Sequence, residues 1–365
     1  MKNLFALALG LLLLAGCGKD SDDDLVPATP SLNVPLTPVA TSTVQWTGVA
    51  VARDGRVFAN FPRMETDTIP YSVAEVSGTS ATPFPDAAWN TWDRSMAPQN
   101  KFVCVQSVYI DANNFLWVLD AAAPQMRGVV PGGAKLLKFD VGTRQLVQRI
   151  DFTDPTVVYP TSYLNDVRID TQNNVAYITD SNAGAIIVVN LATSRARRLL
   201  GNHPSTKSEK LIITAEGRVW RNQSGKLPDI DSDGLALSPN RDYLYYHALT
   251  ARTLYRIATQ YLRDEALPQS QLAQRVETVA STNPPDGMAF DAAGNLYLTD
   301  IENNAVTRIT AGGQFQVVAQ EAQLKWPDSF AVASDGAVYV TTSQLHIPRR
   351  ERTEPYRIFK LAVPQ

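Results

Sequence analysis

The sequence predicts an all-β fold, a six-bladed β-propeller whose four-stranded antiparallel blades surround a central channel. Three observations support this prediction. One pattern of strand, turn and strand recurs six times, and its turn residues recur every 43 to 68 residues. Helix patterns are nearly absent apart from residues 262–274. Units of about fifty residues that hold four short strands are typical of propeller blades.

Each copy of the repeat has an alternating apolar strand, a turn built on Asp, Asn or Gly, and a second strand that ends in a small polar residue. Turns such as Asp54-Gly55 and Asp335-Gly336 tolerate the positive φ angles of tight hairpins. Several copies are followed by two further strand-like segments, which completes four strands per blade. The turn residues are Asp54, Asp111, Asp170, Ser238, Asp291 and Ser334.

The N-terminus reads as a bacterial lipoprotein signal. Residues 1–16, "MKNLFALALGLLLLAG", place a lysine before an apolar run that is too short for a stable membrane span. The segment from Leu14 to Cys17 resembles a lipobox, which makes Cys17 the expected lipidation site and the membrane a partner through acyl chains. An ordinary signal peptide is the alternative. Gly18 after the cysteine favours export, so we expect a lipoprotein outside the cytoplasm, on the outer membrane or cell surface.

The chain behind the signal divides into a tether and one folded domain. Residues 17–43 are rich in Asp, Pro, Ser and Thr without an apolar period, which predicts a flexible tether. Residues 44–365 are long enough for one propeller, which we expect to be monomeric. Their single cysteine, Cys104, excludes an internal disulfide and is expected to be a buried, inert thiol. A net charge of −3 without a basic block argues against nucleic acid as a partner.

Several segments are specific enough to indicate a family. They are "CVQSVYIDANNFLWVLD", "KLLKFDVGTRQLVQRI", "LNDVRIDTQNNVAYITDS", "DGLALSPNRDYLYYHALTARTLYRIATQYLR" and "LKWPDSFAVASDGAVYV". In this order, over residues 104–361, they resemble the major royal jelly protein/Yellow family. That resemblance implies a secreted propeller; some insect members resemble binders of biogenic amines, and bacterial homologues are described as related to dopachrome tautomerase. Fold alone does not certify any of these activities.

A more distant resemblance, to gluconolactonase/regucalcin-like propellers, concerns a metal at the channel mouth. The strings "LNDVRID", "SDGLALS" and "PPDGMAF" match that group's ligand motifs, which implies Asn165, Asp233 and Asp286 as metal ligands. Ligands that offer only oxygen suit Ca²⁺ or Mg²⁺. The sequence departs from the group at two points: Asp233 stands where the group has Asn, and the acidic ligand of the early blade has no match.

Four aspartates stand just before the innermost strand of successive repeats. Because inner strands converge on the channel, Asp166, Asp233, Asp286 and Asp328 should face one another across it. Carboxylates gathered in one funnel repel each other, which raises some of their pKa values unless a cation neutralises them. The ring would attract a divalent cation or a cationic amine. The alternative is that each aspartate only caps its blade by accepting backbone N–H bonds.

Three further residues complete the candidate ligand site. Trp46 and Gln106 occupy the equivalent positions of the first two repeats and should reach the same rim. His247 ends a second strand and is a ligand candidate, although a structural role for this histidine is the main alternative.

The function that these features favour is binding of a small molecule, an amine or an aromatic compound, at the channel mouth, with or without a divalent cation. Two other classes stay open: an enzyme, either a metal-dependent lactonase-type hydrolase or a tautomerase, and a surface module that binds proteins. The chain has no Gly-x-Ser-x-Gly, CxxC or HExxH motif and no glycine-rich phosphate loop, so nucleophilic, redox and nucleotide chemistry have no support.

Overall fold

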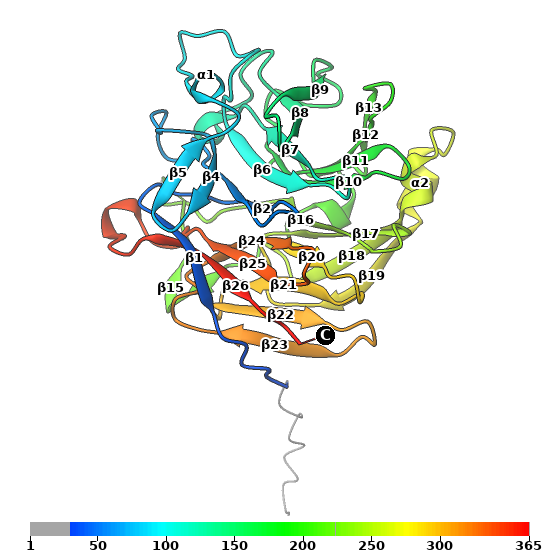
Figure 1. The fold of residues 1–365 in the computed structure, drawn as a ribbon. Coiled ribbons are helices and arrows are strands. Elements are labelled where there is room, and N and C mark those ends of the chain that lie inside the picture. Colours follow the sequence, from blue (N-terminus) through cyan, green and yellow to red (C-terminus); the bar gives the residue numbers. More distant parts are fainter. Residues whose placement is uncertain (1–29, 223, 365) are drawn as a thin grey trace, which may run out of the picture.

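Six four-stranded sheets arranged in a ring form the protein (Figure 1), as the computed structural model of residues 30–222 and 224–364 shows. All strand pairs in the six sheets are antiparallel, and in five of the sheets the four strands follow one another along the chain. The structure confirms the predicted six-bladed propeller. Residues 1–29, which include Cys17, lie outside the described residues, and so do Gln223 and Gln365.

The first three blades, given from the inner to the outer strand, hold twelve strands. They are β2 (Val49–Val51), β3 (Val57–Asn60), β4 (Val73–Ser77) and β5 (Ser80–Pro83); β6 (Val105–Ile110), β7 (Phe115–Asp120), β8 (Lys135–Asp140) and β9 (Leu146–Asp151); β10 (Leu164–Asp170), β11 (Val175–Asp180), β12 (Ala185–Asn190) and β13 (Ala196–Leu199).

The last three blades follow the same order and end with the most N-terminal described strand. They are β16 (Ser232–Leu237), β17 (Tyr243–Ala248), β18 (Thr253–Ala258) and β19 (Val276–Ser281); β20 (Met288–Phe290), β21 (Leu296–Asp300), β22 (Ala305–Ile309) and β23 (Phe315–Gln320); β24 (Pro327–Val332), β25 (Val338–Thr342), β26 (Tyr356–Leu361) and β1 (Thr37–Ser42).

The ring is closed by strand β1, which the sequence prediction missed. β1 pairs antiparallel with β26, with Thr41 opposite Arg357, and so supplies the outer strand of the sixth blade. The prediction that residues 17–43 form a flexible tether is therefore wrong for residues 37–42. The first and last strands of the domain share one sheet, so the two ends of the propeller hold each other in place.

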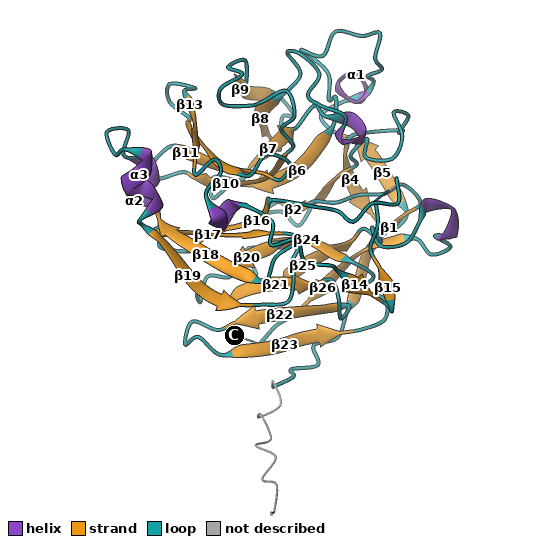
Figure 2. Cartoon of the chain, turned by 180° about the vertical axis from the view of Figure 1, so that it is seen from behind, coloured by secondary structure: helices purple, strands orange, loops and turns teal. Residues whose placement is uncertain are grey.

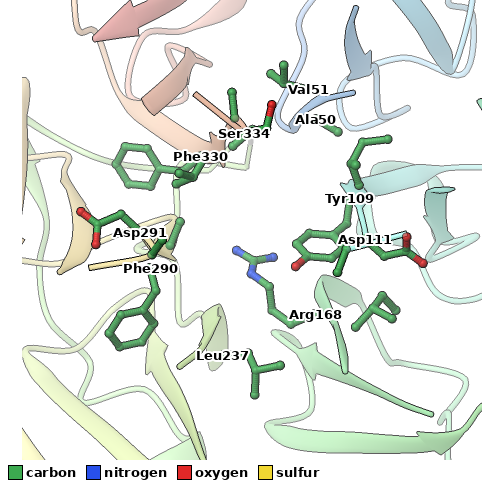
Figure 3. A pocket seen from close by; sticks show the side chains of 18 of the residues that line it. Ala50, Val51, Tyr109, Asp111, Arg168, Leu237, Phe290, Asp291, Phe330 and Ser334 are labelled. Carbon is green, nitrogen blue, oxygen red and sulfur yellow. The ribbon is translucent and has the colours of Figure 1, made fainter. Parts of the chain in front are cut away.

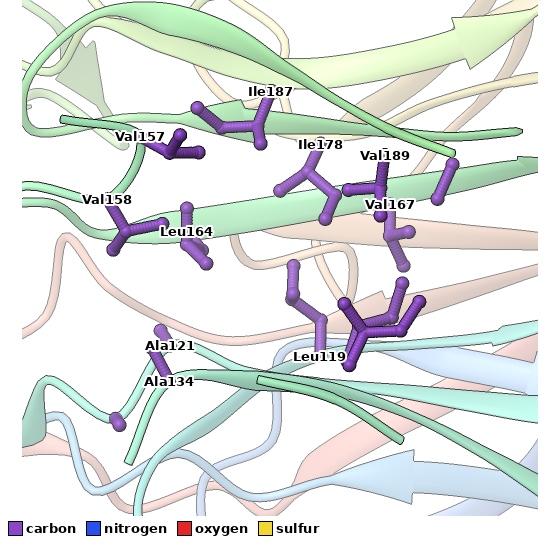
Figure 4. Close-up of a cluster of buried hydrophobic side chains, with 14 of the residues drawn as sticks. Leu119, Ala121, Ala134, Val157, Val158, Leu164, Val167, Ile178, Ile187 and Val189 are labelled. Atoms are coloured by element: carbon purple, nitrogen blue, oxygen red, sulfur yellow. The ribbon is translucent and has the colours of Figure 1, made fainter. Parts of the chain in front are cut away.

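The six inner strands line the channel in chain order. Each inner strand contacts the next, and the last contacts the first; in order they are β2, β6, β10, β16, β20 and β24. Their side chains alternate between the faces of each blade, and the faces of neighbouring blades pack together. Figure 4 shows this packing between blades 2 and 3, where Leu119 lies across from Val167, Ile178 and Val189. Burial of such apolar faces stabilises the ring because each blade covers its neighbour.

The helices are short and do not contribute to the channel. α1 (Ala87–Asn90), α2 (Thr259–Arg263) and α3 (Gln269–Ala273) lie at the periphery (Figure 2). The expected helix at residues 262–274 is present as two pieces, α2 and α3. Among the described residues, no helix has the length and apolar character that crossing a bilayer requires. A small ribbon, β14 (Thr214–Ala215) with β15 (Arg218–Val219), extends one loop.

Two Asp-Gly pairs let the inner strands approach each other closely. A Cβ atom at Gly287 would collide with the carbonyl oxygen of Asp328 in the next blade, and one at Gly234 would stand 2.8 Å from the carbonyl oxygen of Asp286. Only glycine leaves room for the neighbouring backbone at these positions. The glycines of "SDGLALS" and "PPDGMAF" therefore serve strand packing around the channel, and they bring the aspartates of successive blades together.

Candidate functional site: the acidic end of the channel

Three buried aspartates and one partly buried aspartate, Asp166, mark the end of the channel where the inner strands begin. Asp166 lies in β10, Asp233 in β16 and Asp328 in β24, while Asp286 stands two residues before β20. Asp233 and Asp328 are 4% exposed and Asp286 is 9% exposed. We call these four residues the carboxylate ring. The sequence prediction that they gather from successive blades agrees with their mutual electrostatic effects.

The carboxylates of the ring raise one another's pKa values. Burial raises the pKa of Asp233 well above its usual range, and repulsion from Asp286, Asp166 and Asp328 adds to this effect. Burial likewise raises the pKa of Asp286 to about 7, although a hydrogen bond from Trp326 opposes the shift. Burial and repulsion from Asp286 raise the pKa of Asp328 in the same way. Burial and repulsion disfavour the ionised form of these carboxyl groups, and a cation that binds between them stabilises that form.

Side-chain contacts orient the three residues that the sequence implied as metal ligands. The Asn165 amide donates a hydrogen bond to the Asp233 carboxylate, which joins blades 3 and 4. The indole Nε1 of Trp326 donates to Asp286 Oδ2 over 2.6 Å. Trp326 is a site residue that sequence reasoning missed, although it stands in the quoted segment "LKWPDSFAVASDGAVYV" directly before Pro327.

The inner-strand backbones are capped by hydroxyl groups and not by the ring carboxylates. Thr179 Oγ1 accepts a hydrogen bond from the backbone N–H of Asp166 over 3.0 Å, and Thr299 Oγ1 accepts one from that of Asp286 over 2.8 Å. Thr341 Oγ1 likewise accepts a hydrogen bond from the backbone N–H of Ser329. In the described residues, the carboxylates of Asp233 and Asp286 accept hydrogen bonds from side chains alone. The capping alternative therefore does not explain why these two carboxylates are buried.

Blades 1, 2 and 3 bring an indole, an amide and a phenol group to the same end. The Tyr163 hydroxyl donates to Gln106 Oε1 over 2.8 Å. Burial raises the pKa of Tyr163 well above its usual range, and the negative charges of Asp233 and Asp328 add to this effect, so Tyr163 lies near the ring. Trp46 is 1% exposed. The sequence offered no signal for Tyr163, because a lone tyrosine before a strand is usually part of the core.

Two buried polar atoms, Trp46 Nε1 and Ser232 Oγ, have no hydrogen-bond partner among the described residues. Ser232 directly precedes Asp233 of the ring, and Trp46 precedes the inner strand of blade 1. A buried polar atom without a partner costs free energy, so such atoms are usually satisfied by water or a ligand. Their gathering here supports a polar ligand at this end.

Asp166 differs from the rest of the ring because it has a cationic neighbour. Its Oδ2 lies 3.4 Å from Nη2 of Arg168, and its Oδ1 accepts a hydrogen bond from Ser107 Oγ over 3.4 Å. Burial still raises the pKa of Asp166, while Arg168 opposes this. Asp233, Asp286 and Asp328 have no such ion pair in the described part of the chain. The capacity of the ring to hold a cation therefore rests on these three.

His247 and Cys104 are buried within the fold. Both ring nitrogens of His247 are engaged: Nδ1 lies 2.6 Å from the carbonyl oxygen of Ala248, and Nε2 lies 3.1 Å from Thr282 Oγ1. Burial lowers the pKa of His247 to about 4. These contacts describe a structural role, and its ligand role stays a prediction. Cys104 is completely buried and free, and burial raises the pKa of its thiol to about 12, as expected for an inert thiol.

The donor atoms at the ring fit a hard divalent cation. Asn165, Asp233 and Asp286 offer an amide and two carboxylates, and oxygen donors of this kind are those that Ca²⁺ and Mg²⁺ prefer. Turning the Asn165 amide over would direct its oxygen to the place where its NH2 group now meets Asp233. Within residues 30–222 and 224–364, no three His, Cys, Asp or Glu side chains form a ready metal cluster. The metal site stays a prediction.

The fold and this site define a class, six-bladed propellers with an acidic end to the channel. Residues 103–357 match the profile of the family described as "Major royal jelly protein", and the chain belongs to this family. Major royal jelly protein 7 of Apis mellifera is 26% identical over 258 residues, which cover 66% of this chain and 54% of that protein. The chain thus spans about half the length of this relative.

Two further matches are to lactonases, the kind of protein that the sequence resembled more distantly. The 6-deoxy-6-sulfogluconolactonase of Pseudomonas putida is 32% identical over 117 residues, which cover 31% of this chain and 38% of that enzyme. A gluconolactonase structure from Xanthomonas campestris superposes with a TM-score of 0.53 at 13% identity, and it covers 93% of this chain and 99% of its own. At this identity the superposition shows a common fold alone.

Proposed function

We propose that this propeller binds a divalent cation, Ca²⁺ or Mg²⁺, at the carboxylate ring and a small molecule beside it at the channel mouth. The observation that carries the proposal is the burial of Asp233, Asp286 and Asp328 without a cationic partner among the described residues. Asn165, Asp233 and Asp286 would hold the cation. Gln106 and Trp46 would contact the small molecule, an amine or an aromatic compound.

The charge of the ring favours a divalent cation over an amine as the first occupant. Three carboxyl groups lack an ion pair, and when they are ionised a single ammonium group would leave two buried negative charges without compensation. An unpaired buried charge is costly, whereas a divalent cation neutralises two of the three. An amine that binds alone is the competing form of this proposal.

Thermal melting of the full chain tests cation binding. A ligand that binds the folded state alone stabilises it by RT ln(1 + [L]/Kd), about 2.7 kcal/mol at one hundred times Kd. We expect Ca²⁺ or Mg²⁺ to raise the melting temperature and a chelator to reverse the rise. Asp286→Asn should abolish it, while Asp54→Asn, which removes an exposed carboxylate of the first hairpin turn, should not. No shift with either cation, or an unchanged shift in Asp286→Asn, would refute the site.

A metal-dependent lactonase-type hydrolase is the second candidate. It is favoured by the likeness to the sulfogluconolactonase, which covers about a third of this chain. A bound divalent cation would polarise the lactone carbonyl group. Blade 1 argues against this candidate, since its segment "VQWTGVAV" offers Gln45, Trp46 or Thr47 and no acid to match the early-blade ligand of the lactonase-like group. Turnover of a lactone that depends on added cation and is lost in Asp233→Asn would establish the enzyme; cation binding without turnover would favour the binder. The tautomerase and protein-interaction alternatives have no supporting contact in the described residues.

We also propose that the chain is exported and anchored to a membrane through a lipidated Cys17, a residue outside the described part of the structure. The support is the sequence from Leu14 to Cys17, in which small residues precede a cysteine after a leucine run. Cys17→Ser should release the protein into soluble fractions or stall its processing. Complete partition of the Cys17→Ser protein with membranes would contradict the proposal.

A further inference from the structure

A cavity of about 370 Å³ opens at the opposite end of the channel from the carboxylate ring (Figure 3). It is lined by the last residues of the inner strands and by the turns that follow them. Its lining is mixed: polar residues stand beside apolar ones, with Val51, Leu237, Phe290 and Phe330 among the apolar ones. Ligand pockets in proteins have volumes of roughly 300–1,000 Å³, and they combine apolar walls with a few convergent polar groups. This cavity has the size and the walls of a small-molecule site.

One arginine lies at the centre of the cavity. Figure 3 shows the Arg168 guanidinium in the middle of the space with Tyr109 beside it, and the guanidinium carbon lies 5.5 Å from the Tyr109 ring centre. Arg168 is 8% exposed. Its Nη2 donates to the carbonyl oxygen of Met288 over 2.7 Å, and its Nη1 donates to that of Val167 over 2.8 Å. Because Val167 is in blade 3 and Met288 in blade 5, the side chain spans the channel and is held there.

The negative groups at the edge of the cavity are already satisfied by the fold. Asp111 accepts hydrogen bonds from two backbone N–H groups of its turn and from the Trp117 indole over 2.8 Å. Asp291 accepts from the backbone and amide of Asn295. In Figure 3 both carboxylates point away from the space around Arg168. They therefore compete only weakly with an incoming anion for the Arg168 guanidinium.

The positive charge at the centre is only partly balanced. Its one ion pair in the described residues is the 3.4 Å contact with Asp166, whose carboxylate lies on the side of the ring. The hydrogen bonds to Met288 and Val167 go to neutral carbonyl groups. Arg53 and Arg241 add two further guanidinium groups to the lining. Among the described residues, no acceptor meets Arg168 Nε, and one of the two Nη1 hydrogens is also left over after the bond to Val167. An arginine with such donors in a partly apolar cavity suits a carboxylate, because guanidinium and carboxylate groups pair through charged hydrogen bonds.

We propose that this cavity binds a small organic acid whose carboxylate pairs with Arg168 and whose apolar part, a ring or a short alkyl chain, packs against the inner-strand side chains. The site is distinct from the carboxylate ring and has the opposite charge preference. The volume accommodates an organic acid with one aromatic ring and a substituent. Tyr109 would contact the face or the edge of such a ligand.

The test compares matched probes on the full chain. Benzoate, phenylacetate and hexanoate are each paired with the corresponding amide, and binding is measured by thermal melting and by ligand-observed NMR. We expect the acids to bind and the amides to bind at least tenfold more weakly, because a charged hydrogen-bond pair is lost. Chloride and phosphate at the same ionic strength serve as inorganic anions. Equal binding of acids and amides, no binding of any acid, or binding of the inorganic anions alone would overturn the proposal.

Two variants locate the binding. Arg168→Met should weaken the acids by roughly ten- to a hundredfold. Because it also removes the bonds to Met288 and Val167, Ala331→Phe provides a second test that leaves Arg168 in place. Ala331 lines the cavity, is partly exposed and also packs against the core between blades 6 and 1, so a larger side chain narrows the space, and an unchanged melting temperature without ligand shows that the fold is kept. Arg195→Met removes an exposed arginine of the outer surface and should change nothing. Acid binding that survives Ala331→Phe unchanged would place the site elsewhere and refute the assignment.

Discussion

His247 is expected to make the propeller sensitive to acid. Its side chain is completely buried, and its hydrogen bonds suit the neutral ring with the proton on Nδ1, because the Ala248 carbonyl can only accept and the Thr282 hydroxyl can donate to Nε2. Burial lowers its pKa to about 4 in the folded protein. In the unfolded chain a histidine has a pKa of about 6.5.

The sign and size of the effect follow from these two pKa values. Between pH 6.5 and 4 the histidine is protonated in the unfolded chain but neutral in the folded protein. The contribution of His247 to the free energy of unfolding is therefore complete above pH 6.5 and decreases as the pH drops towards 4. At about 1.36 kcal/mol for each pKa unit, the loss is about 3 kcal/mol. This is a large part of the 5–15 kcal/mol that typical proteins have.

The assay is denaturant unfolding of the wild-type chain and His247→Gln at a series of pH values from 7.5 to 4. Glutamine keeps a donor and an acceptor but does not titrate, so the variant has a lower stability at neutral pH and a flatter pH profile. The difference in unfolding free energy between the two proteins should change by about 3 kcal/mol across this range, while contributions of other titrating groups cancel. His203→Gln is the comparison: that ring is only half-buried, and although burial lowers its pKa too, its variant should show a smaller change with pH than His247→Gln. A difference that stays constant with pH would refute the structural role of His247.

Two further predictions concern the ring of blades. A chain that begins at residue 44 lacks β1 and should lose its cooperative thermal transition, whereas one that begins at residue 30 should melt like the full chain; equal melting of both would contradict closure by the β1–β26 pair. Gly287→Ala should lower the free energy of unfolding by at least 1–3 kcal/mol, because the new methyl group collides with the backbone of Asp328. Gly312→Ala, where the nearest atom to the new Cβ is 3.7 Å away, should stay within about 0.5 kcal/mol of wild type in the same denaturant titration.

The repeat made most of the fold predictable, and its weakest strand was the one that was missed. Five of the six blades are made of strands that follow one another along the chain, so local periodicity reveals them. β1 has the sequence "TPVATS", and Ala40 alone among its six residues is buried. Without an apolar alternation, and with a partner at the other end of the chain, nothing in the local pattern identifies β1 as a strand.

The candidate site was predictable where it depends on repeat position, and not where it depends on side-chain direction. The ring aspartates stand at equivalent positions of successive repeats, so their convergence follows from the fold. Trp326 and Tyr163 reach the ring from outside the repeat pattern, and their roles appear only in their contacts with Asp286 and Gln106. Arg168 resembled an ordinary strand residue, because nothing in the sequence says that its side chain crosses the channel.

The position of Arg168 explains how one channel can serve two ligands of opposite charge. Its guanidinium crosses from blade 3 to the Met288 carbonyl of blade 5 and also meets Asp166, so it separates the acidic end from the cavity at the other end. A cation at the ring is then on the carboxylate side of this barrier, and an organic acid is on the other.

Because Arg168 contacts both ends, occupation of one should change the charge that the other ligand meets. An anion that pairs with Arg168 weakens its hold on Asp166, and that carboxylate then becomes more available to a cation at the ring. The two ligands should therefore bind with positive coupling, and Arg168→Met should abolish it in titrations of Ca²⁺ with and without saturating benzoate. Equal cation affinity in the two titrations of the wild-type chain would show that the barrier isolates the two ends completely.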